Sequence, residues 1–138
     1  MKLTTSELAN RYLTLAATVL AAFGLLLIFV PTRLMHLLSI PVSPTGTLFM
    51  QFLGASLAGH AFLNWRARHF EANVLRVVYE MNVVALSLAV CISLMAIFAT
   101  SYSRICLLIF IMHSLFLTGF LVIVRKLPED VAYKKNLR

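Results

Sequence analysis

The chain has 138 residues, of which 61% are hydrophobic and 12% are charged, and its formal net charge is +7. A soluble domain usually carries about 25% charged residues, so this composition excludes an ordinary soluble protein and indicates an integral membrane protein. The length is that of one domain, residues 1–138.

Four apolar runs are close to the roughly 20 residues that a helix needs to span a bilayer. They cover residues 12–30, 46–65, 77–99 and 105–124. We expect helices, because backbone groups in lipid must form hydrogen bonds within their own segment. None of the runs shows the period-two alternation that is typical of barrel strands. The sequence therefore predicts an all-α membrane protein with four spans.

The first run also has one feature of a secretory signal peptide, since Lys2 and Arg11 precede it. It is long for the apolar region of a signal and has no clear cleavage site, so we expect it to be retained as a span. Thr4 and Glu7 have the spacing of a capping box, which predicts that the helix begins before the apolar run.

Short connections separate the runs. Residues 31–45 contain three prolines, which we expect to stop helix propagation. Residues 66–76 are polar, and residues 100–104 form a tight polar turn. Because short connections make sequential helices antiparallel neighbours, the predicted fold is a bundle of four antiparallel transmembrane helices.

The basic residues divide unevenly between the two sides of such a bundle. Arg33 and Arg104 fall on one side. The other side, with both termini, holds Lys2, Arg11, Arg66, Arg68, Arg76, Arg125, Lys126, Lys134, Lys135 and Arg138. Basic residues gather on the cytoplasmic side, so both termini are predicted to be cytoplasmic, including a tail at residues 127–138. The positive net charge is then explained by the orientation in the membrane and by attraction to anionic lipid headgroups, and it does not indicate nucleic-acid binding.

Polar side chains within the apolar runs are the candidate functional residues, because polar groups at that depth are costly. At about 100° per residue, Ser56, His60 and Asn64 share one stripe of the second helix. Glu80 is the only acid within the four runs, and it lies at the depth of Asn64 for a rise of about 1.5 Å per residue. We therefore expect His60, Asn64 and Glu80 to form a one-sided pocket that opens toward the cytoplasm, with Ser56 beside it.

Two polar residues do not fit this stripe. Asn82 lies about 200° around the third helix from Glu80, and Gln51 is opposite His60 on the second helix. Both are expected to form hydrogen bonds within their own helix, with another helix or with a partner chain. Ala55 and Gly59 form a small-x-x-x-small pair that lets helices approach closely, which also agrees with an oligomer.

Each candidate also has a structural interpretation. His60 could be a neutral buried histidine bonded across helices, and His113, near the middle of the fourth run, could be packed with a hydrogen bond. Glu80 could pair with Arg76 at the i, i+4 spacing. A second role for His60 and His113 would be to bind a haem, but their depths differ by roughly 8 Å, whereas axial ligands should be nearly level. No metal site or nucleophile arrangement is indicated, and the cofactor, if any, is not specified by the sequence.

Two segments resemble a group of small uncharacterised bacterial inner-membrane proteins. The first is Phe29-Val30-Pro31 with Leu34, Leu37-Leu38 and Ile40, and the second is Gln51–Ala55, Gly59 and Leu63–Arg68. The resemblance covers the first two predicted helices. It implies a four-helix integral protein of the bacterial inner membrane, and it implies no activity.

Three functions are compatible with these features. The leading hypothesis is a non-enzymatic structural or accessory subunit of a homo- or hetero-oligomer in the membrane. The second is a binder or carrier that holds a lipid, quinone or pigment against His60, Asn64 and Glu80, with Ser56 and His113 as further contacts. The third, which the residues favour least, is a haem protein or membrane enzyme.

Overall fold

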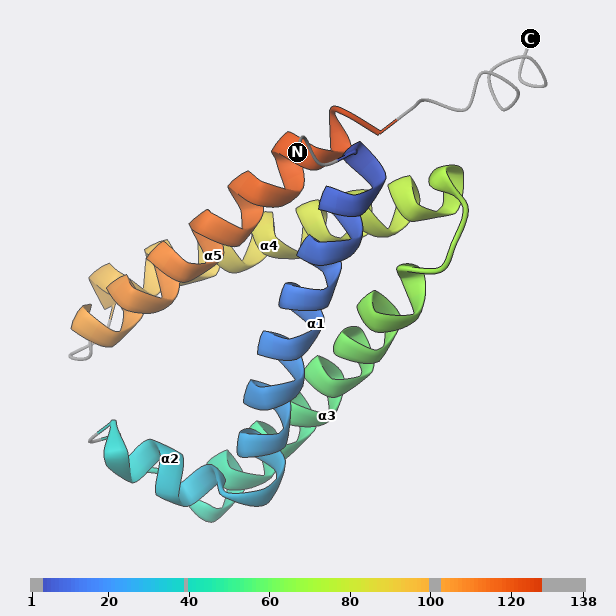
Figure 1. Cartoon of the computed structure of the whole chain (residues 1–138). Coiled ribbons are helices and arrows are strands. Elements are labelled where there is room, and N and C mark those ends of the chain that lie inside the picture. Colours follow the sequence, from blue (N-terminus) through green and yellow to red (C-terminus); the bar gives the residue numbers. More distant parts are fainter. Residues whose placement is uncertain (1–3, 39, 100–102, 128–138) are drawn as a thin grey trace, which may run out of the picture.

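The computed structural model describes residues 4–38, 40–99 and 103–127 (Figure 1). Its helices are α1 (Thr5–Phe29), α2 (Pro31–Leu37), α3 (Pro44–Ala67), α4 (Ala72–Ala99) and α5 (Ser103–Val124). No strand occurs within these ranges, which confirms the all-α class. The predicted turn at residues 100–104 and the predicted tail at 127–138 fall mostly outside the described residues.

Three helical stretches are long and apolar enough to cross a membrane: Thr5–Phe29, Val74–Phe98 and Arg104–Val124. They correspond to the first, third and fourth predicted spans. Helix α3 has 24 residues, which is long enough, but threonine, glutamine, histidine and asparagine side chains lower its apolar character. The fourth span, and with it the count of four, stays a prediction.

The connection at residues 31–45 differs from the expectation, because it contains the seven-residue helix α2. Pro31 is at the start of α2, and Pro44 is the first residue of α3. Proline suits the first helical position, where its fixed φ is helical and its missing N–H needs no partner. Ser43 caps α3 by accepting a hydrogen bond from the Gly46 amide at 3.1 Å. The prolines therefore start helices here as well as separating them.

The predicted capping box begins α1. The Thr4 hydroxyl oxygen accepts a hydrogen bond from the Glu7 amide at 3.3 Å, and the Thr4 amide donates to the Glu7 carboxylate at 2.9 Å. Two amides at the helix start thus gain partners that the helix itself does not supply. The helix begins seven residues ahead of the apolar run at residue 12, as expected from the sequence.

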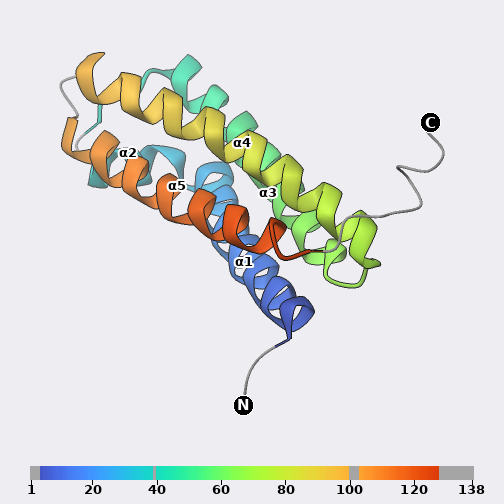
Figure 2. The ribbon, with the colours of Figure 1, turned by 90° about the horizontal axis from the view of Figure 1, so that it is seen from above.

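The helices form two hairpins that meet at one end of the molecule. Helix α1 packs along α3, and α4 packs along α5, while contacts between the two pairs are few. Figure 1 shows the two hairpins diverging from the end where α1 begins and α5 ends, and Figure 2 shows α4 and α5 side by side from a second direction. The molecule is therefore an open pair of hairpins more than a closed four-helix bundle.

The α1–α3 hairpin depends on a close approach at Gly24 and Gly54. A Cβ atom on Gly54 would lie 2.7 Å from the Gly24 carbonyl oxygen and 2.9 Å from the Leu27 Cβ. A Cβ atom on Gly24 would lie 2.8 Å from the Gly54 carbonyl oxygen. All three distances are too short for a side chain at either position, so the two glycines allow the backbones of α1 and α3 to touch. Such contacts between small residues drive helix association in lipid.

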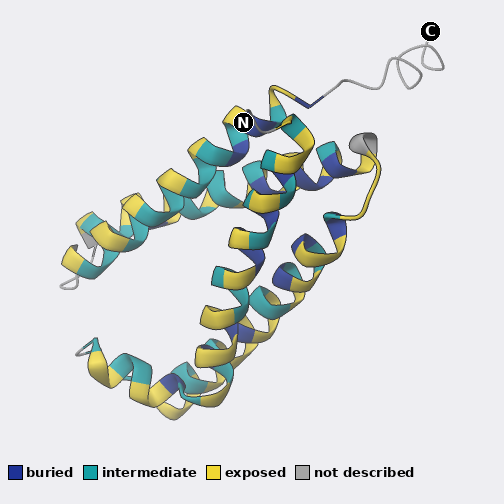
Figure 3. Ribbon diagram, viewed as in Figure 1, coloured by how far each residue is buried: buried dark blue, intermediate teal, exposed yellow. Residues whose placement is uncertain are grey.

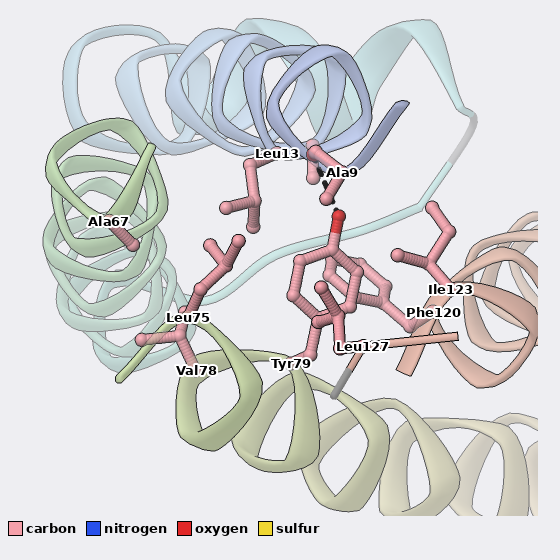
Figure 4. Close-up of a cluster of buried hydrophobic side chains, with 10 residues drawn as sticks. Ala9, Leu13, Ala67, Leu75, Val78, Tyr79, Phe120, Ile123 and Leu127 are labelled. Atoms are coloured by element: carbon pink, nitrogen blue, oxygen red, sulfur yellow. Dashed lines mark hydrogen bonds between the residues drawn. The ribbon is translucent and has the colours of Figure 1, made fainter. Parts of the chain in front are cut away.

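The core lies where the hairpins meet. Its buried residues are Ala9, Leu13, Ala16, Ala67, Leu75, Val78, Tyr79, Phe120, Ile123 and Leu127. Figure 4 shows that the labelled side chains of this cluster come from α1, α3, α4, α5 and the segment directly after α5. The Tyr79 hydroxyl donates to the Ala9 carbonyl at 2.7 Å, and the Tyr12 hydroxyl donates to the Phe116 carbonyl at 3.0 Å. These two phenols join α1 to α4 and to α5.

Away from this core the apolar side chains face outward. Figure 3 shows buried residues concentrated at the meeting end and exposed residues along the outer halves of the hairpins. Phe98 is 85% exposed, Phe29 76% and Met95 71%. Contiguous exposure of large apolar side chains is unfavourable in water and favourable in lipid, which agrees with contact with a bilayer.

Two glycine variants test the close approach. Gly54→Ala should lower the free energy of unfolding by about 1–3 kcal/mol, because the new methyl group collides with the backbone of α1. Gly59→Ala is the matched control on the same helix, since a Cβ there meets nothing within 4 Å. That control should be neutral or stabilising by up to about 1 kcal/mol, from helix propensity. Thermal unfolding in detergent, followed by circular dichroism, measures both, and equal stability of the two variants would contradict the packing.

Candidate functional site

A polar cluster lies where α3 meets α4, and Asn82 is at its centre. The Asn82 amide nitrogen donates to the Asn64 side-chain oxygen at 2.9 Å and to the Val78 carbonyl at 2.8 Å. The Asn82 side-chain oxygen accepts from the Asn64 amide at 3.2 Å and lies 3.0 Å from His60 Nε2. Asn64 is fully buried, and Asn82 is 3% exposed. This cluster is the main polar link between the two hairpins in the described part of the chain.

The arrangement corrects the expected partner of His60 and Asn64. Asn82, which the helical wheel placed away from the site, bonds both residues. Glu80 instead pairs with Arg76 on its own helix, with Arg76 Nε 2.9 Å from the Glu80 carboxylate and the Glu80 side chain 53% exposed. The two residues are about 200° apart on α4, so only one of them can face α3. A buried amide costs less than a buried carboxylate, and the amide therefore occupies the interior position.

The other predicted site residues lie apart from this cluster. The Ser56 hydroxyl donates to the Phe52 carbonyl of its own helix at 3.1 Å, and Ser56 is exposed. His113 of α5 bonds Ser93 of α4, with 3.2 Å between His113 Nδ1 and the Ser93 hydroxyl oxygen. Gln51 bonds another helix, as one of its expected alternatives stated, because its amide donates to the Ile28 carbonyl near the end of α1 at 3.1 Å.

A pocket of about 160 Å³ lies between the two hairpins. It is lined by Ala16, Val19, Leu20, Leu57, His60, Asn82, Ala85, Leu86, Ala89, Met112, His113, Phe116 and Phe120. All four long helices contribute to this lining. His60 and Asn82 bring the polar cluster to the pocket, and His113 adds a third polar side chain. The rest of the lining is apolar, so the pocket has apolar walls that contain a few polar groups.

The bonds of Asn82 define the tautomer of His60. The Val78 carbonyl can only accept, so the Asn82 atom facing it is the amide nitrogen. The Asn82 oxygen is then the atom that meets His60 Nε2, and an oxygen of an amide accepts. His60 must donate from Nε2, and in the neutral imidazole Nδ1 carries the lone pair.

The tautomer of His113 follows from Ser93 in the same way. The Ser93 hydroxyl donates its hydrogen to the Ala89 carbonyl at 2.6 Å. Its oxygen can then only accept from His113 Nδ1. His113 therefore carries its hydrogen on Nδ1, and its Nε2 holds the lone pair. The two histidines of the pocket are thus opposite tautomers.

The described residues contain no group of three or more histidine, cysteine, aspartate or glutamate side chains that could hold a metal ion. A haem between His60 and His113 also does not fit the bonds of these histidines. Their partners on α4, Asn82 and Ser93, are separated by about 16 Å along the helix axis, for a rise of about 1.5 Å per residue. Axial ligands of one iron should be nearly level, so bonds to partners this far apart do not favour a shared haem.

Comparison with family models, curated proteins and solved structures gives no match to this chain. The resemblance to small bacterial inner-membrane proteins therefore remains a prediction from the sequence. The site has to be interpreted from its own residues.

Asn82 bonds its own helix at Val78 and another helix at Asn64 and His60, as two of its expected alternatives stated, but the sequence did not predict it as a site residue. Its type did carry a signal, because it is an amide in an apolar run and cannot reach the headgroups as a long acidic side chain can. Glu80 and Asn82 lie on opposite faces of α4, so only one of them can be the partner of Asn64. The lower cost of burying a neutral amide favours Asn82 for that interior position.

The bond between Asn64 and Asn82 can be measured with a double-mutant cycle. Asn64→Leu and Asn82→Leu should each destabilise the protein, because each removes the mutual bonds and leaves polar atoms of the other buried amide without a partner. The double variant should be less destabilised than the sum of the two, with a coupling energy of about 1 kcal/mol. Unfolding in mixed micelles provides the free energies. The control pair is Asn64→Leu with Thr118→Val on the exposed surface of α5, and its two losses in free energy of unfolding should add. If the losses of the two asparagine variants also simply added, the link between Asn64 and Asn82 would be refuted.

The tautomers give a spectroscopic prediction. In protein labelled with ¹⁵N-histidine at neutral pH, the His60 Nε2 and the His113 Nδ1 should be the protonated nitrogens. Nitrogen spectra distinguish protonated from lone-pair nitrogens, and His60→Gln and His113→Gln assign the signals. Finding the same tautomer at both positions would disprove the hydrogen-bond arrangement described above.

Proposed function

We propose that this protein is a non-catalytic membrane protein that binds a small apolar molecule between its two hairpins. The pocket lined by His60, Asn82 and His113 is the observation that carries this proposal. It lies among all four long helices, and its walls are apolar except for these three side chains. Pockets that bind small molecules typically combine an apolar lining with a few placed polar groups.

The size of the pocket limits its occupant. A cavity of about 150 Å³ with apolar walls is sufficient to bind benzene. The present pocket, at about 160 Å³, therefore accommodates one ring or a short stretch of hydrocarbon chain. A longer molecule would place only one end in the pocket, with the remainder between the diverging hairpins or in lipid. Lipids, quinones and pigments with ring or chain ends all meet this limit.

The chemistry of the cluster supports binding more than catalysis. Asn64 and Asn82 do not ionise, and they bond each other. Glu80, the one acid within the predicted spans, is paired with Arg76 and exposed. Proton transfer usually needs a carboxylate or a histidine next to a reacting group with its partner in place. Here the histidines are the sole titratable side chains of the pocket lining.

The proposed location is the bacterial inner membrane, with four spans and both termini in the cytoplasm. Support for the orientation comes from the end where the hairpins meet, because Arg66, Arg68, Arg76, Arg125 and Lys126 belong to helix ends or connections there. The opposite end has Arg33 and Arg104. The pocket would then lie near the cytoplasmic half of the bilayer.

Filling the pocket tests the proposal. Native mass spectrometry of gently purified protein should detect a bound small molecule of defined mass. Ala89→Phe places a large ring in the pocket and should reduce the bound fraction at least about tenfold, equivalent to about 1.4 kcal/mol. Ala22→Phe, on the exposed surface of α1, is the matched control and should retain the molecule. Equal occupancy of both variants would count against this pocket as the site.

An accessory subunit is the second candidate, because α3 presents an exposed pair of small residues. Ala55 and Gly59 are exposed, and the space next to Gly59 is open. A helix of another chain could approach closely there, as small-x-x-x-small pairs allow. The same mass spectra count chains: a stable complex of several chains without a small molecule would favour the subunit function over the binding function.

A further inference from the structure

The hydrogen-bonding state of the pocket restricts what can bind in it. We propose that the pocket selects apolar molecules that carry a hydroxyl group over molecules of the same size that lack one. This inference rests on the proposed binding function and adds the class of ligand. It follows from which atoms of the three polar lining residues remain available.

Asn82 has no capacity left for a ligand. Its amide nitrogen donates to Asn64 and to Val78, and its oxygen accepts from Asn64 and from His60. An amide has two hydrogens and two lone pairs, and all of them are in use. Asn82 therefore positions His60 and does not itself bind a ligand.

His60 offers an acceptor. Its Nε2 hydrogen is directed to Asn82, so the nitrogen that remains is Nδ1 with its lone pair. Within the described residues, Nδ1 of His60 has no hydrogen-bond partner in the protein. It is also not one of the fully buried polar atoms that lack a partner, so a ligand can reach it. Nδ1 can thus accept a hydrogen bond from a bound molecule, and it has no hydrogen to donate to one.

His113 offers a second acceptor. Its Nδ1 hydrogen is used on Ser93, whose own hydrogen is used on Ala89. Nε2 therefore carries the lone pair. It has no hydrogen-bond partner among the described residues, and the protein does not enclose it. The two histidines that line the pocket thus each keep one acceptor nitrogen that the protein does not enclose, and none of the three polar lining side chains has a hydrogen left to donate.

A hydroxyl group satisfies such a pocket, because it donates its hydrogen to an imidazole lone pair. A carbonyl or ether oxygen brings only lone pairs, so neither it nor the histidine gains a bond. Sites built to bond a hydroxyl reject analogues that lack it far more strongly than apolar pockets reject a change in size. The ligand class is thus a phenol or alcohol with an apolar body, and the pocket volume admits one ring.

The test compares two probes of the same size in purified protein. 4-Ethylphenol carries the hydroxyl group, and 4-ethyltoluene has a methyl group in its place. Titration calorimetry yields the ratio of their dissociation constants in the wild type and in the double variant His60→Leu/His113→Leu. Comparing ratios removes the different partitioning of the two probes into detergent. His36→Leu/His69→Leu makes the same changes at exposed histidines and is the matched control.

We expect the preference for 4-ethylphenol to fall roughly 3- to 10-fold in the pocket double variant, the range of one net hydrogen bond, and to stay unchanged in the control. An unchanged ratio in the pocket variant, with both probes still binding, would overturn the hydroxyl selectivity and leave the binding function standing. Absence of saturable binding of either probe to the wild type would overturn both.

A spectroscopic measurement keeps the test decisive if the double variant does not fold. In the ¹⁵N-histidine spectrum of the wild type, 4-ethylphenol should shift the lone-pair nitrogen of His60 or of His113, because that nitrogen gains a hydrogen bond. 4-Ethyltoluene should leave both lone-pair nitrogens unshifted. Identical spectra with the two probes, at saturating concentrations of each, would overturn the hydroxyl selectivity.

Discussion

Asn82 uses its whole side-chain hydrogen-bonding capacity at the point where the two hairpins meet. Two of its four bonds go to Asn64 and one to His60, both on α3, and the fourth returns to α4 itself. In a molecule whose hairpins share few other contacts, this link sets how α3 lies against α4. The apolar core around Tyr79 lies beside it and excludes water, which strengthens each of these bonds.

The pocket is a consequence of that junction. The hairpins are held together by the core and the asparagine pair at one end and diverge beyond it (Figure 1). Side chains of all four long helices line the pocket that is left between them. The same bonds that hold the junction orient His60, and a parallel bond to Ser93 orients His113. Structural bonds thus determine which polar atoms remain for a ligand.

The sequence predicted the long helices well, because run length and apolar character depend on each segment alone. It also predicted the capping box, which needs residues only three positions apart. The geometry between helices was harder to predict. A helical wheel correctly separated Glu80 from Asn82, but it could not tell which faced α3. The angle between the hairpins, and hence the pocket, depends on contacts such as Gly24 with Gly54, which are distant in sequence.

Helix α3 has a further consequence for how the protein is made. Among the long helices of the described residues, α3 alone is not apolar enough to be a candidate span, and its polar side chains have partners on α1 and α4. Alone in lipid, it would leave those side chains without hydrogen bonds, which is costly. A stable position of α3 in lipid would therefore depend on α1, whose glycine contact it shares. The order of synthesis provides this partner helix, because α1 is made first and is already available when α3 emerges.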